Sequence, residues 1–276
     1  MTAADLAGVV LAAGAGTRLR PLTHLRPKAL CPVGGVTLLD HALARLHPHA
    51  GDGPAHLAVN AHHHAGMVVA HVGGRAHTSV EQPEALGTAG ALGALRPWID
   101  GRDVLLTNAD AYLPDGLAAL TAGWDHERCR LLVVPAGGRG DFRDARGAVR
   151  YVGACLLPWR LVTGLTARIS GLYEVLWRRE DAAGRLDLVR GDGTAIDCGT
   201  PADYLRANLH ATGGRSAIGR GAVVEGHVER CVVWDGAYVG PGEHLVDCIR
   251  AGDAEAPVTV PALGSQVSHG SPDAPG

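Results

Sequence analysis

Short β-branched or leucine-rich runs alternate with longer segments rich in alanine and leucine from Gly8 to about residue 211. This order is typical of β-α-β units that build a parallel sheet, because parallel strands need a crossover connection that is usually a helix. We therefore expect an α/β fold, with a Rossmann-like mixed, mostly parallel sheet flanked by helices. The expected strands are Gly8–Ala13, His56–Val59, Thr78–Glu81, Asp103–Thr107, Arg130–Val134, Tyr151–Leu157 and Thr194–Asp197. The expected helices are Thr37–Leu46, Ala61–His71, Ala89–Leu95, Asp115–Ala122, Leu172–Arg179 and Pro201–Leu209, the last with Thr200 as N-cap.

The periodicity changes after Gly213-Gly214, where small and β-branched residues recur roughly every six positions until about residue 250. This rhythm resembles the hexapeptide left-handed β-helix, over a length of about two coils. We therefore expect a main domain over residues 1–212 and a short β-helix-like segment over 213–250. Residues 251–276, rich in Pro, Ser and Gly, are expected to form a flexible tail.

Composition excludes several classes of function. The 276 residues carry 25 Lys+Arg against 28 Asp+Glu, so no basic excess favours a nucleic-acid or anionic-membrane partner. The apolar runs fall far short of the ~20 residues that cross a bilayer, and the N-terminus lacks a basic region before its apolar run. We expect a cytoplasmic protein. The six cysteines contain no C-x-x-C pair, which favours neither a disulfide framework nor a zinc site.

The first strand runs directly into a glycine-rich turn, Gly14-Ala15-Gly16-Thr17-Arg18, and Pro27-Lys28 follows. Glycines let backbone N–H groups approach a phosphate, and open α/β sheets bind ligands at the carboxyl ends of their strands. A dinucleotide fingerprint is disfavoured because Leu19 stands at its third glycine position, and a Walker A motif is absent. What remains is a loop whose two cations, Arg18 and Lys28, are spaced to face one anion.

The whole pattern, L-A-A-G-x-G-T-R-L-x-P-L-T followed by P-K, resembles the signature of the sugar-1-phosphate nucleotidylyltransferases. Three later segments resemble this family in the same order. Glu81–Leu92 is similar to its nucleobase segment, Thr107–Asp110 to its strand-end metal aspartate, and Ile196–Tyr204 to its second aspartate in D-x-G-T-P-x-D-Y. The four matches extend over residues 9–208.

The resemblance implies an EC 2.7.7 enzyme in which a sugar-1-phosphate attacks the α-phosphorus of a nucleoside triphosphate. The product is an NDP-sugar, and pyrophosphate leaves. The implied catalytic residues are Arg18, Lys28, Asp110 and Asp197, with Asp110 and Asp197 holding Mg²⁺ together with phosphate oxygens. The implied partners are the NTP and the sugar-1-phosphate, with no nucleic acid and no membrane. We expect these residues to converge around a single triphosphate at one rim of the sheet.

The resemblance also implies a set of nucleotide-binding residues, although for Thr88 an N-cap role remains an alternative. The Leu-Gly-Thr-Ala-Gly-Ala-Leu run resembles mannose-1-phosphate guanylyltransferases, which favours GTP with a mannose-1-phosphate-like substrate. Arg139-Gly140-Asp141-Phe142 instead resembles N-acetylmuramate-1-phosphate uridylyltransferases, so the base stays open. The implied nucleotide-binding residues are Leu11, Ala13, Gly14, Gly16, Thr17, Arg18, Gln82, Gly87 and Thr88.

One departure from the family concerns the sugar phosphate. Many members carry a Glu-Lys-Pro element whose lysine contacts it, whereas the corresponding stretch 138–147 contains no lysine, and Lys28 is the only lysine in the chain. Our hypothesis is that Arg139, Arg143 or Arg146 replaces that lysine, because guanidinium groups bind phosphate bidentately. A solvated loop is the alternative. The expected sugar-phosphate contacts are Lys28, Arg139, Arg143 and Gly153.

Other functions agree less well with the sequence. The same reaction with another sugar phosphate or a cyclitol phosphate stays open. A non-catalytic regulatory subunit is the alternative of another class, but it would be expected to lose Arg18, Lys28 or the aspartates, and all are retained. An acyltransferase of the β-helix type needs several full coils. Consecutive residues point to different faces, so His62-His63-His64 indicates a polar helix entry rather than a metal site. Homo-oligomerisation through the C-terminal segment is left open.

Overall fold

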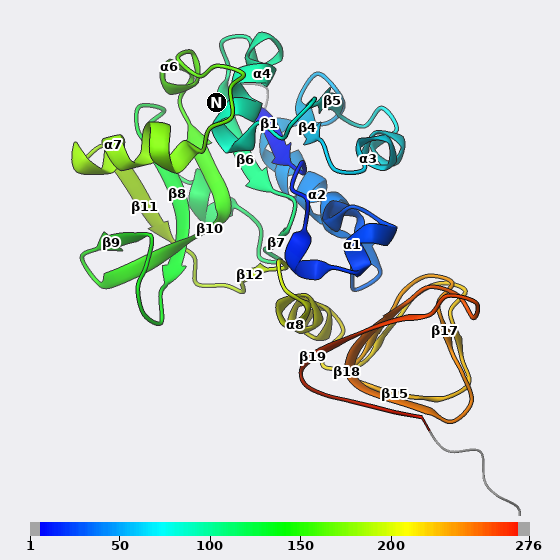
Figure 1. Ribbon diagram of the computed structural model, residues 1–276. Helices are drawn as coiled ribbons and strands as arrows, with labels where there is room; N and C mark the ends of the chain where they lie inside the picture. Colours follow the sequence, from blue (N-terminus) through cyan, green and yellow to red (C-terminus); the bar gives the residue numbers. More distant parts are fainter. Residues whose placement is uncertain (1–5, 270–276) are drawn as a thin grey trace, which may run out of the picture. The chain divides into compact units, whose positions relative to one another are not determined.

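The computed structural model describes residues 6–269 (Figure 1). Its chain packs into two compact units. The first, here the sheet unit, contains the described residues up to Ala15 together with Leu39–Ala195. The second, here the coil unit, contains Gly16–Leu38 together with the described residues from Ile196 onward. The boundary expected after residue 212 therefore falls inside the coil unit, and the glycine loop is divided at Ala15.

The sheet unit is built on one mixed sheet flanked by helices (Figure 1). Neighbouring strands are parallel on the side of β1 that carries β4 and β5, and β6 is also parallel to β1. The next strand, β10, is antiparallel to both of its neighbours. Across the sheet the strands are β5 (His77–Val80), β4 (Leu57–Ala61), β1 (Leu6–Leu11), β6 (Asp103–Asn108), β10 (Gly147–Leu157), β8 (Cys129–Pro135) and β11 (Leu186–Arg190).

The central strands are buried, which explains their continuous apolar sequences. Ala7, Val9 and Val104 are inaccessible to solvent and join the core of the sheet unit. The helices of this unit are α2 (Leu38–Ala50, whose first residue is counted with the coil unit), α3 (Ala65–Val72), α4 (Gly87–Ile99), α5 (Ala118–Thr121), α6 (Trp159–Val162), a π-helical turn (Tyr173–Trp177) and α7 (Arg178–Ala182). All expected strands and helices up to residue 182 are confirmed, with shifted ends. The sequence prediction missed β11 and the short strand β9 (Phe142–Asp144), which pairs with β10.

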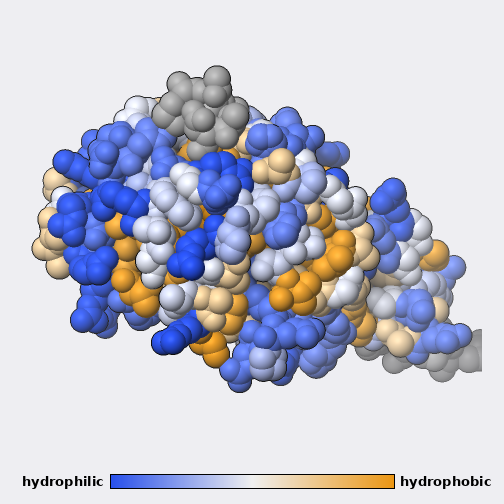
Figure 2. Space-filling view, turned by 90° about the horizontal axis from the view of Figure 1, so that it is seen from above, coloured by the Kyte–Doolittle hydropathy of each residue, from blue (hydrophilic) through white to orange (hydrophobic). Residues whose placement is uncertain are grey.

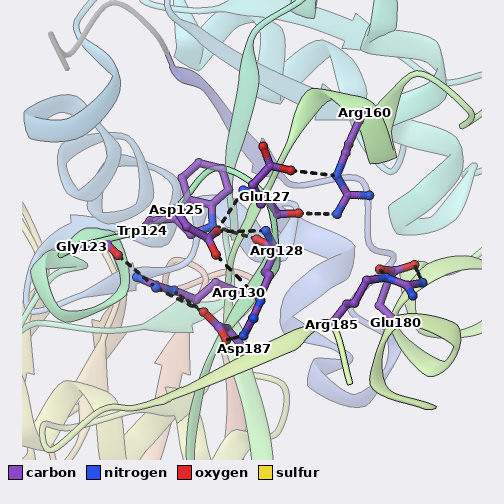
Figure 3. Close-up of polar contacts among 10 residues, drawn as sticks. All are labelled: Gly123, Trp124, Asp125, Glu127, Arg128, Arg130, Arg160, Glu180, Arg185 and Asp187. Atoms are coloured by element: carbon purple, nitrogen blue, oxygen red, sulfur yellow. Dashed lines mark hydrogen bonds and ion pairs between the residues drawn. The ribbon is translucent and has the colours of Figure 1, made fainter. Parts of the chain in front are cut away.

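A network of charged side chains ties β8 to β11 and to the chain after α5 (Figure 3). Arg130, which is buried, donates to the carbonyls of Ala122 (2.8 Å) and Gly123 (3.3 Å) and contacts Asp187 at 3.2 Å. Arg128 approaches the same Asp187 carboxylate at 3.6 Å. Carbonyls that point out of the end of α5 thus receive donors from a fixed cation.

The coil unit begins with the rest of the glycine loop. It contains a 3₁₀ turn (Thr17–Leu19), α1 (Leu22–Leu25), a second 3₁₀ turn (Lys28–Leu30) and the hairpin β2 (Pro32–Val33) with β3 (Val36–Thr37). After residue 195 follow β12 (Ile196–Asp197) and α8 (Pro201–Ala211). The predicted cap of α8 is confirmed, because Thr200 Oγ1 accepts from the Asp203 backbone N–H at 3.2 Å.

Short parallel strands form a small curled sheet in the rest of the coil unit (Figure 1). Ala217 pairs with Val232 and Val223 with Tyr238, each 15 residues on, whereas His227 pairs with His244, 17 residues on. The expected stacking of parallel strands is present. A strict hexapeptide rhythm would give multiples of six, so the spacing departs from that repeat. The strands are β13 (Ala217–Ile218), β14 (Val223–Val224), β15 (His227–Glu229), β16 (Val232–Val233), β17 (Tyr238–Val239) and β18 (Glu243–Ala251).

The prediction of a flexible tail from residue 251 is wrong for the residues that the structure describes. Strand β19 (Val258–His269) pairs antiparallel with β18. The edge of β18 presents backbone N–H and C=O groups that a further strand can pair, and Val258-Thr259-Val260 has the β-branched side chains that favour a strand. Residues 270–276 of the predicted tail lie outside the described residues.

The surface agrees with this architecture. The face drawn in Figure 2 is mainly hydrophilic, with apolar patches between the polar groups, as is usual for globular proteins. Within residues 6–269, every helix is too short or too polar to cross a lipid bilayer.

Helix α4 packs closely against residues 166–170 because Gly87, Gly90 and Gly93 recur every three residues along it. An added Cβ at Gly90 would overlap the Arg168 carbonyl, and one at Gly93 would overlap the backbone of Thr166. Since backbone atoms cannot move aside as a flexible side chain can, this face of α4 requires glycine.

We expect Gly93→Ala to lower the free energy of unfolding by about 2–3 kcal/mol, since the new methyl group forces α4 away from Thr166. Gly66→Ala in α3 is the matched control. Its Cβ would meet nothing within 4 Å, so a gain of about 0.5–1 kcal/mol is expected from the better helix former. Denaturant unfolding followed by circular dichroism measures both, and equal effects at the two positions would contradict the packing argument.

Candidate functional site

The carboxyl ends of β1 and β6 meet at one edge of the sheet unit. Leu11 pairs with Asn108, and its carbonyl accepts from the Ala109 backbone N–H at 2.9 Å. Asp110 follows immediately and is partly exposed. The structure therefore places the metal aspartate predicted from the sequence beside the start of the glycine loop, at the edge where open α/β sheets bind ligands.

Two glycines near this edge have different reasons to be glycine. An added Cβ at Gly14 would meet no protein atom within 4 Å, so packing within the chain does not require it. Gly153 in β10 has φ +86°, and its Cβ would lie 2.8 Å from Ala111 Cβ. Its carbonyl accepts from Thr107 Oγ1 at 3.1 Å. Close approach of strands thus explains Gly153, which the sequence assigned only to the sugar phosphate.

The nucleobase segment leads into α4. Gly87, the first residue of α4, has φ +73°, and its Cβ would lie 2.6 Å from the Ser170 carbonyl oxygen. Thr88 Oγ1 accepts from the Leu172 backbone N–H at 2.8 Å. Because the helix already begins at Gly87, the alternative that Thr88 is its N-cap is wrong. Gln82 is exposed before the helix.

Two buried polar side chains, which the sequence did not single out, connect these parts of the sheet unit. Asn60 at the end of β4 accepts from the Ala12 backbone N–H at 2.7 Å and donates to Glu81 Oε1 at 2.7 Å. Glu81 Oε2 accepts from the Leu86 backbone N–H at 2.7 Å. A carboxylate directly after a short strand is the only sequence signal that could have indicated this arrangement.

In the coil unit, an arginine and an aspartate face each other. Arg18 lies on the turn Thr17–Leu19 and Asp197 at the end of β12, with Nη2 and Oδ2 3.6 Å apart. Both side chains remain accessible, at 63% and 57% exposure. A Cβ at Gly199 would overlap the Arg18 guanidinium, so glycine at this position leaves room for the arginine.

Lys28 lies against the same loop. Gly16 has φ +60°, and its Cβ would lie 2.8 Å from Thr23 Cγ2 and 3.1 Å from Lys28 Cβ. Thr23 Oγ1 donates to the Gly16 carbonyl at 3.0 Å. Glycine is therefore required here both for the left-handed backbone and for the close approach of Lys28.

The expected site residues thus fall into two groups. The sheet unit contains Leu11, Ala13, Gly14, Gln82, Gly87, Thr88, Asp110, Arg139, Arg143 and Gly153. The coil unit contains Gly16, Thr17, Arg18, Lys28 and Asp197.

The loop that carries Arg18 and Lys28 is anchored on α8 and the curled sheet of the coil unit. Tyr204 of α8 donates its hydroxyl to the Pro32 carbonyl at 2.5 Å and accepts from Trp234 Nε1 at 3.1 Å. The Arg26 guanidinium lies 4.3 Å from the Trp234 ring centre, a cation–π contact. Burial raises the pKa of Tyr204, so its hydroxyl stays protonated and keeps donating.

The arginines proposed for the sugar phosphate lie before β9 and in the hairpin of β9 and β10. Arg139, Arg143 and Arg146 are exposed. The hairpin is fixed by Asp144, which accepts two hydrogen bonds of 2.6 Å from Arg190. These hydrogen bonds lower the pKa of Asp144 to about 2.

The histidine run lies at the entry to α3, as predicted. His62 Nδ1 hydrogen bonds to the Glu81 carbonyl at 3.0 Å, and His64, with φ +50°, precedes the helix. Among residues 6–269, no group of three or more His, Cys, Asp and Glu side chains is arranged to hold a metal ion. One or two carboxylates, completed by phosphate oxygens and water, are nevertheless a ligand set that Mg²⁺ accepts.

The fold and these residues define a nucleotidyltransferase. Residues 8–218 match the family model of the MobA-like NTP transferase domain. Because the match extends over most of the chain, the chain belongs to this family, and it is a sugar-phosphate nucleotidylyltransferase of the EC 2.7.7 class. The family expected from the sequence is confirmed.

Individual relatives agree with this assignment. N-acetylmuramate alpha-1-phosphate uridylyltransferase of Caulobacter vibrioides is 31% identical over 242 residues, covering 75% of this chain and 97% of the relative. The bifunctional protein GlmU of Francisella philomiragia is 34% identical over 161 residues, but only 33% of its length is covered. A crystal structure of mannose-1-phosphate geranyltransferase from Thermus thermophilus has a TM-score of 0.68 at 20% identity, covering 93% of this chain and 95% of that one, and shows the shared fold.

We expect the contact between Asp144 and Arg190 to stabilise the protein above about pH 4 and to lose this effect as pH falls toward 2. The pKa of Asp144 is about 2 in the folded chain and about 3.9 in an unfolded one, so the folded state favours the carboxylate. The difference in free energy of unfolding between wild type and Asp144→Asn should therefore shrink across this window. The exposed Asp192→Asn is the control. A difference that is independent of pH would contradict this account.

Proposed function

We propose that this enzyme transfers a uridylyl group from UTP to an N-acetylmuramate-like sugar α-1-phosphate, which gives a UDP-sugar and pyrophosphate. The supporting observation is the similarity to the Caulobacter uridylyltransferase, which covers 97% of that protein. The segment Arg139-Gly140-Asp141-Phe142, which resembles the same group of enzymes, supports this choice independently of the fold.

In the proposed reaction, a phosphate oxygen of the sugar-1-phosphate forms a bond to the α-phosphorus of UTP. The bond from the α-phosphorus to the bridging oxygen breaks, and pyrophosphate leaves with that electron pair. Negative charge gathers around one phosphorus, so the enzyme must supply fixed cations and donors. We assign the cations to Arg18 and Lys28. The other nucleotide contacts are assigned to Leu11 at the end of β1 and to the backbone of Ala13, Gly14, Gly16 and Thr17.

A role in Mg²⁺ binding is proposed for Asp110 and for Asp197, each because its own motif resembles the family. Asp110 follows β6 and Asp197 is the last residue of β12, and both are accessible to solvent rather than sealed in the core. Carboxylate oxygens suit a hard cation that keeps several positions for phosphate oxygens and water, so the donor types fit this ion. When bound, Mg²⁺ would neutralise charge on the phosphate oxygens. Arg18 lies 3.6 Å from the Asp197 carboxylate, so the arginine proposed for the phosphates and one proposed metal ligand are neighbours.

The base is assigned to the sheet unit. Gln82 is exposed and carries an amide that can read a base edge, and Gly87 presents main chain at the start of α4. Thr88 accepts one hydrogen bond from Leu172 and retains its own O–H donor for the nucleotide. For the sugar phosphate we propose Lys28 with Arg139, Arg143 and the backbone at Gly153.

A second candidate substrate pair is GTP with mannose-1-phosphate. It is supported by the Leu86–Leu92 run, which resembles guanylyltransferases. The uridylyl assignment is preferred because it accounts for similarity along the main domain rather than along one segment.

The substrates are tested by pyrophosphate release with UTP, GTP, CTP, ATP and dTTP, each against N-acetylmuramate α-1-phosphate and mannose-1-phosphate. We expect the highest kcat/KM for UTP with N-acetylmuramate α-1-phosphate, and loss of turnover when EDTA removes Mg²⁺. A preference for GTP with mannose-1-phosphate would replace the proposal by the second candidate.

We expect Asp110→Asn and Asp197→Asn each to lower kcat/KM by about 10²–10³-fold, because an amide lacks the charge that holds the cation. Asp52→Asn, at an exposed loop position, should keep wild-type activity. Steady-state kinetics at increasing Mg²⁺ checks the cause, since a weakened metal site is partly rescued by more metal. Full activity in the double variant would refute the assignment.

A further inference from the structure

The buried side chains Asn60 and Glu81 connect two parts of the sheet unit to which we assign different ends of the nucleotide. Ala12 follows β1 at the start of the glycine loop, and Leu86 directly precedes Gly87. The connection runs from the Ala12 N–H to Asn60 Oδ1, from Asn60 Nδ2 to Glu81 Oε1, and from the Leu86 N–H to Glu81 Oε2. Each of these hydrogen bonds is 2.7 Å long.

We propose that Glu81, acting through Asn60, is a positioning residue that fixes the distance between the triphosphate loop and the nucleobase segment. The inference rests on the proposed function for the assignment of those two segments. The hydrogen bonds themselves are independent of it.

Burial makes this connection specific. Glu81 is 2% exposed and Asn60 is 3% exposed. A buried carboxylate is costly unless its oxygens receive donors, and here each oxygen receives one. The Glu81 backbone is held as well, since its N–H donates to the Ala61 carbonyl at 2.8 Å and its own carbonyl bonds to His62. The carboxylate therefore has little freedom to follow either segment if that segment moves.

The sheet does not need this pair for its own cohesion. Backbone hydrogen bonds already join β1 to β4 and β4 to β5, as far as the residue pairs Leu11–Asn60 and Ala61–Val80. Ala12 and Leu86, in contrast, lie beyond the strand ends. Replacing buried charged groups by apolar ones is often neutral or stabilising, so a buried carboxylate with an amide partner at this place is better explained by positioning than by stability.

The direction of the hydrogen bonds allows the amide and the carboxylate to be exchanged between positions 60 and 81. In Glu81→Gln one oxygen becomes an NH₂ group, which faces either Asn60 Nδ2 or the Leu86 N–H, so two donors meet. In Asn60→Asp two carboxylates meet. In the double variant, the new carboxylate at position 60 would accept from the Ala12 N–H and from the new amide NH₂ at position 81. The oxygen of that amide would accept from the Leu86 N–H. Every donor again has an acceptor, with the charge moved to the other position.

The test compares wild type, E81Q, N60D and the N60D/E81Q double variant in pyrophosphate release, with the melting temperature measured in parallel. We expect each single substitution to raise the KM for the NTP about tenfold or more, because one hydrogen bond to a charged group is lost. The KM for the sugar-1-phosphate should stay within about twofold of wild type. The double variant should return to within about threefold of wild type. Glu127→Gln, at an exposed glutamate of the same unit, is the matched control.

Two kinetic results would overturn the inference: NTP KM values in the single variants equal to wild type, or a double variant whose defect is the product of the two single defects. The rates of amide hydrogen exchange at Ala12 and Leu86 report on these hydrogen bonds in the absence of substrate. Exchange should accelerate at both amides in the single variants and slow again in the double variant. If wild type turns over no NTP while exchange follows this pattern, the proposed function fails and the connection stands. Unchanged exchange in the single variants would refute the connection.

Discussion

The parallel pairing of β1 with β4 and β6 is the constraint on which the rest of the sheet unit depends. It brings the residues that follow three strands to one edge: Ala12 after β1, Asn60 at the end of β4 and Asp110 after β6. Parallel strands end at the same edge of a sheet, so polar groups that are far apart in the sequence gather there. The start of the glycine loop, the carboxylate of Asp110 and a buried amide come to this edge through this one arrangement.

Much of this arrangement could be predicted from the sequence because the signals are local. Apolar runs such as Val104-Leu105-Leu106 indicate buried strands, and Thr200-Pro201 indicates a helix start. The missed strands lie at edges. β11 and β19 depend on β8 and β18 for their pairing, and β9 on a hairpin. Such pairing depends on tertiary structure. From composition alone, we interpreted these segments as loop or tail.

The candidate site shows the same division between local and tertiary information. Motif positions identified Arg18, Lys28, Asp110 and Asp197, but not the environment of any of them. Thr88 could be read as a cap because a threonine before an alanine-rich run has that pattern, yet its hydroxyl serves Leu172, 84 residues further on. The sequence signal for a buried Glu81 was only its place directly after a short strand, since one of its two hydrogen-bond donors, Asn60, lies 21 residues away and is brought close by folding.

The contact between Arg18 and Asp197 has a thermodynamic consequence. In the absence of ligands these opposite charges screen each other at 3.6 Å, while both stay open to water. An anion that takes the guanidinium frees the carboxylate for a cation, and a cation that takes the carboxylate frees the guanidinium. By linkage, each ligand must then raise the affinity for the other by the same factor. If Arg18 binds phosphate and Asp197 binds the cation, as proposed, this exposed ion pair couples the binding of the two oppositely charged ligands.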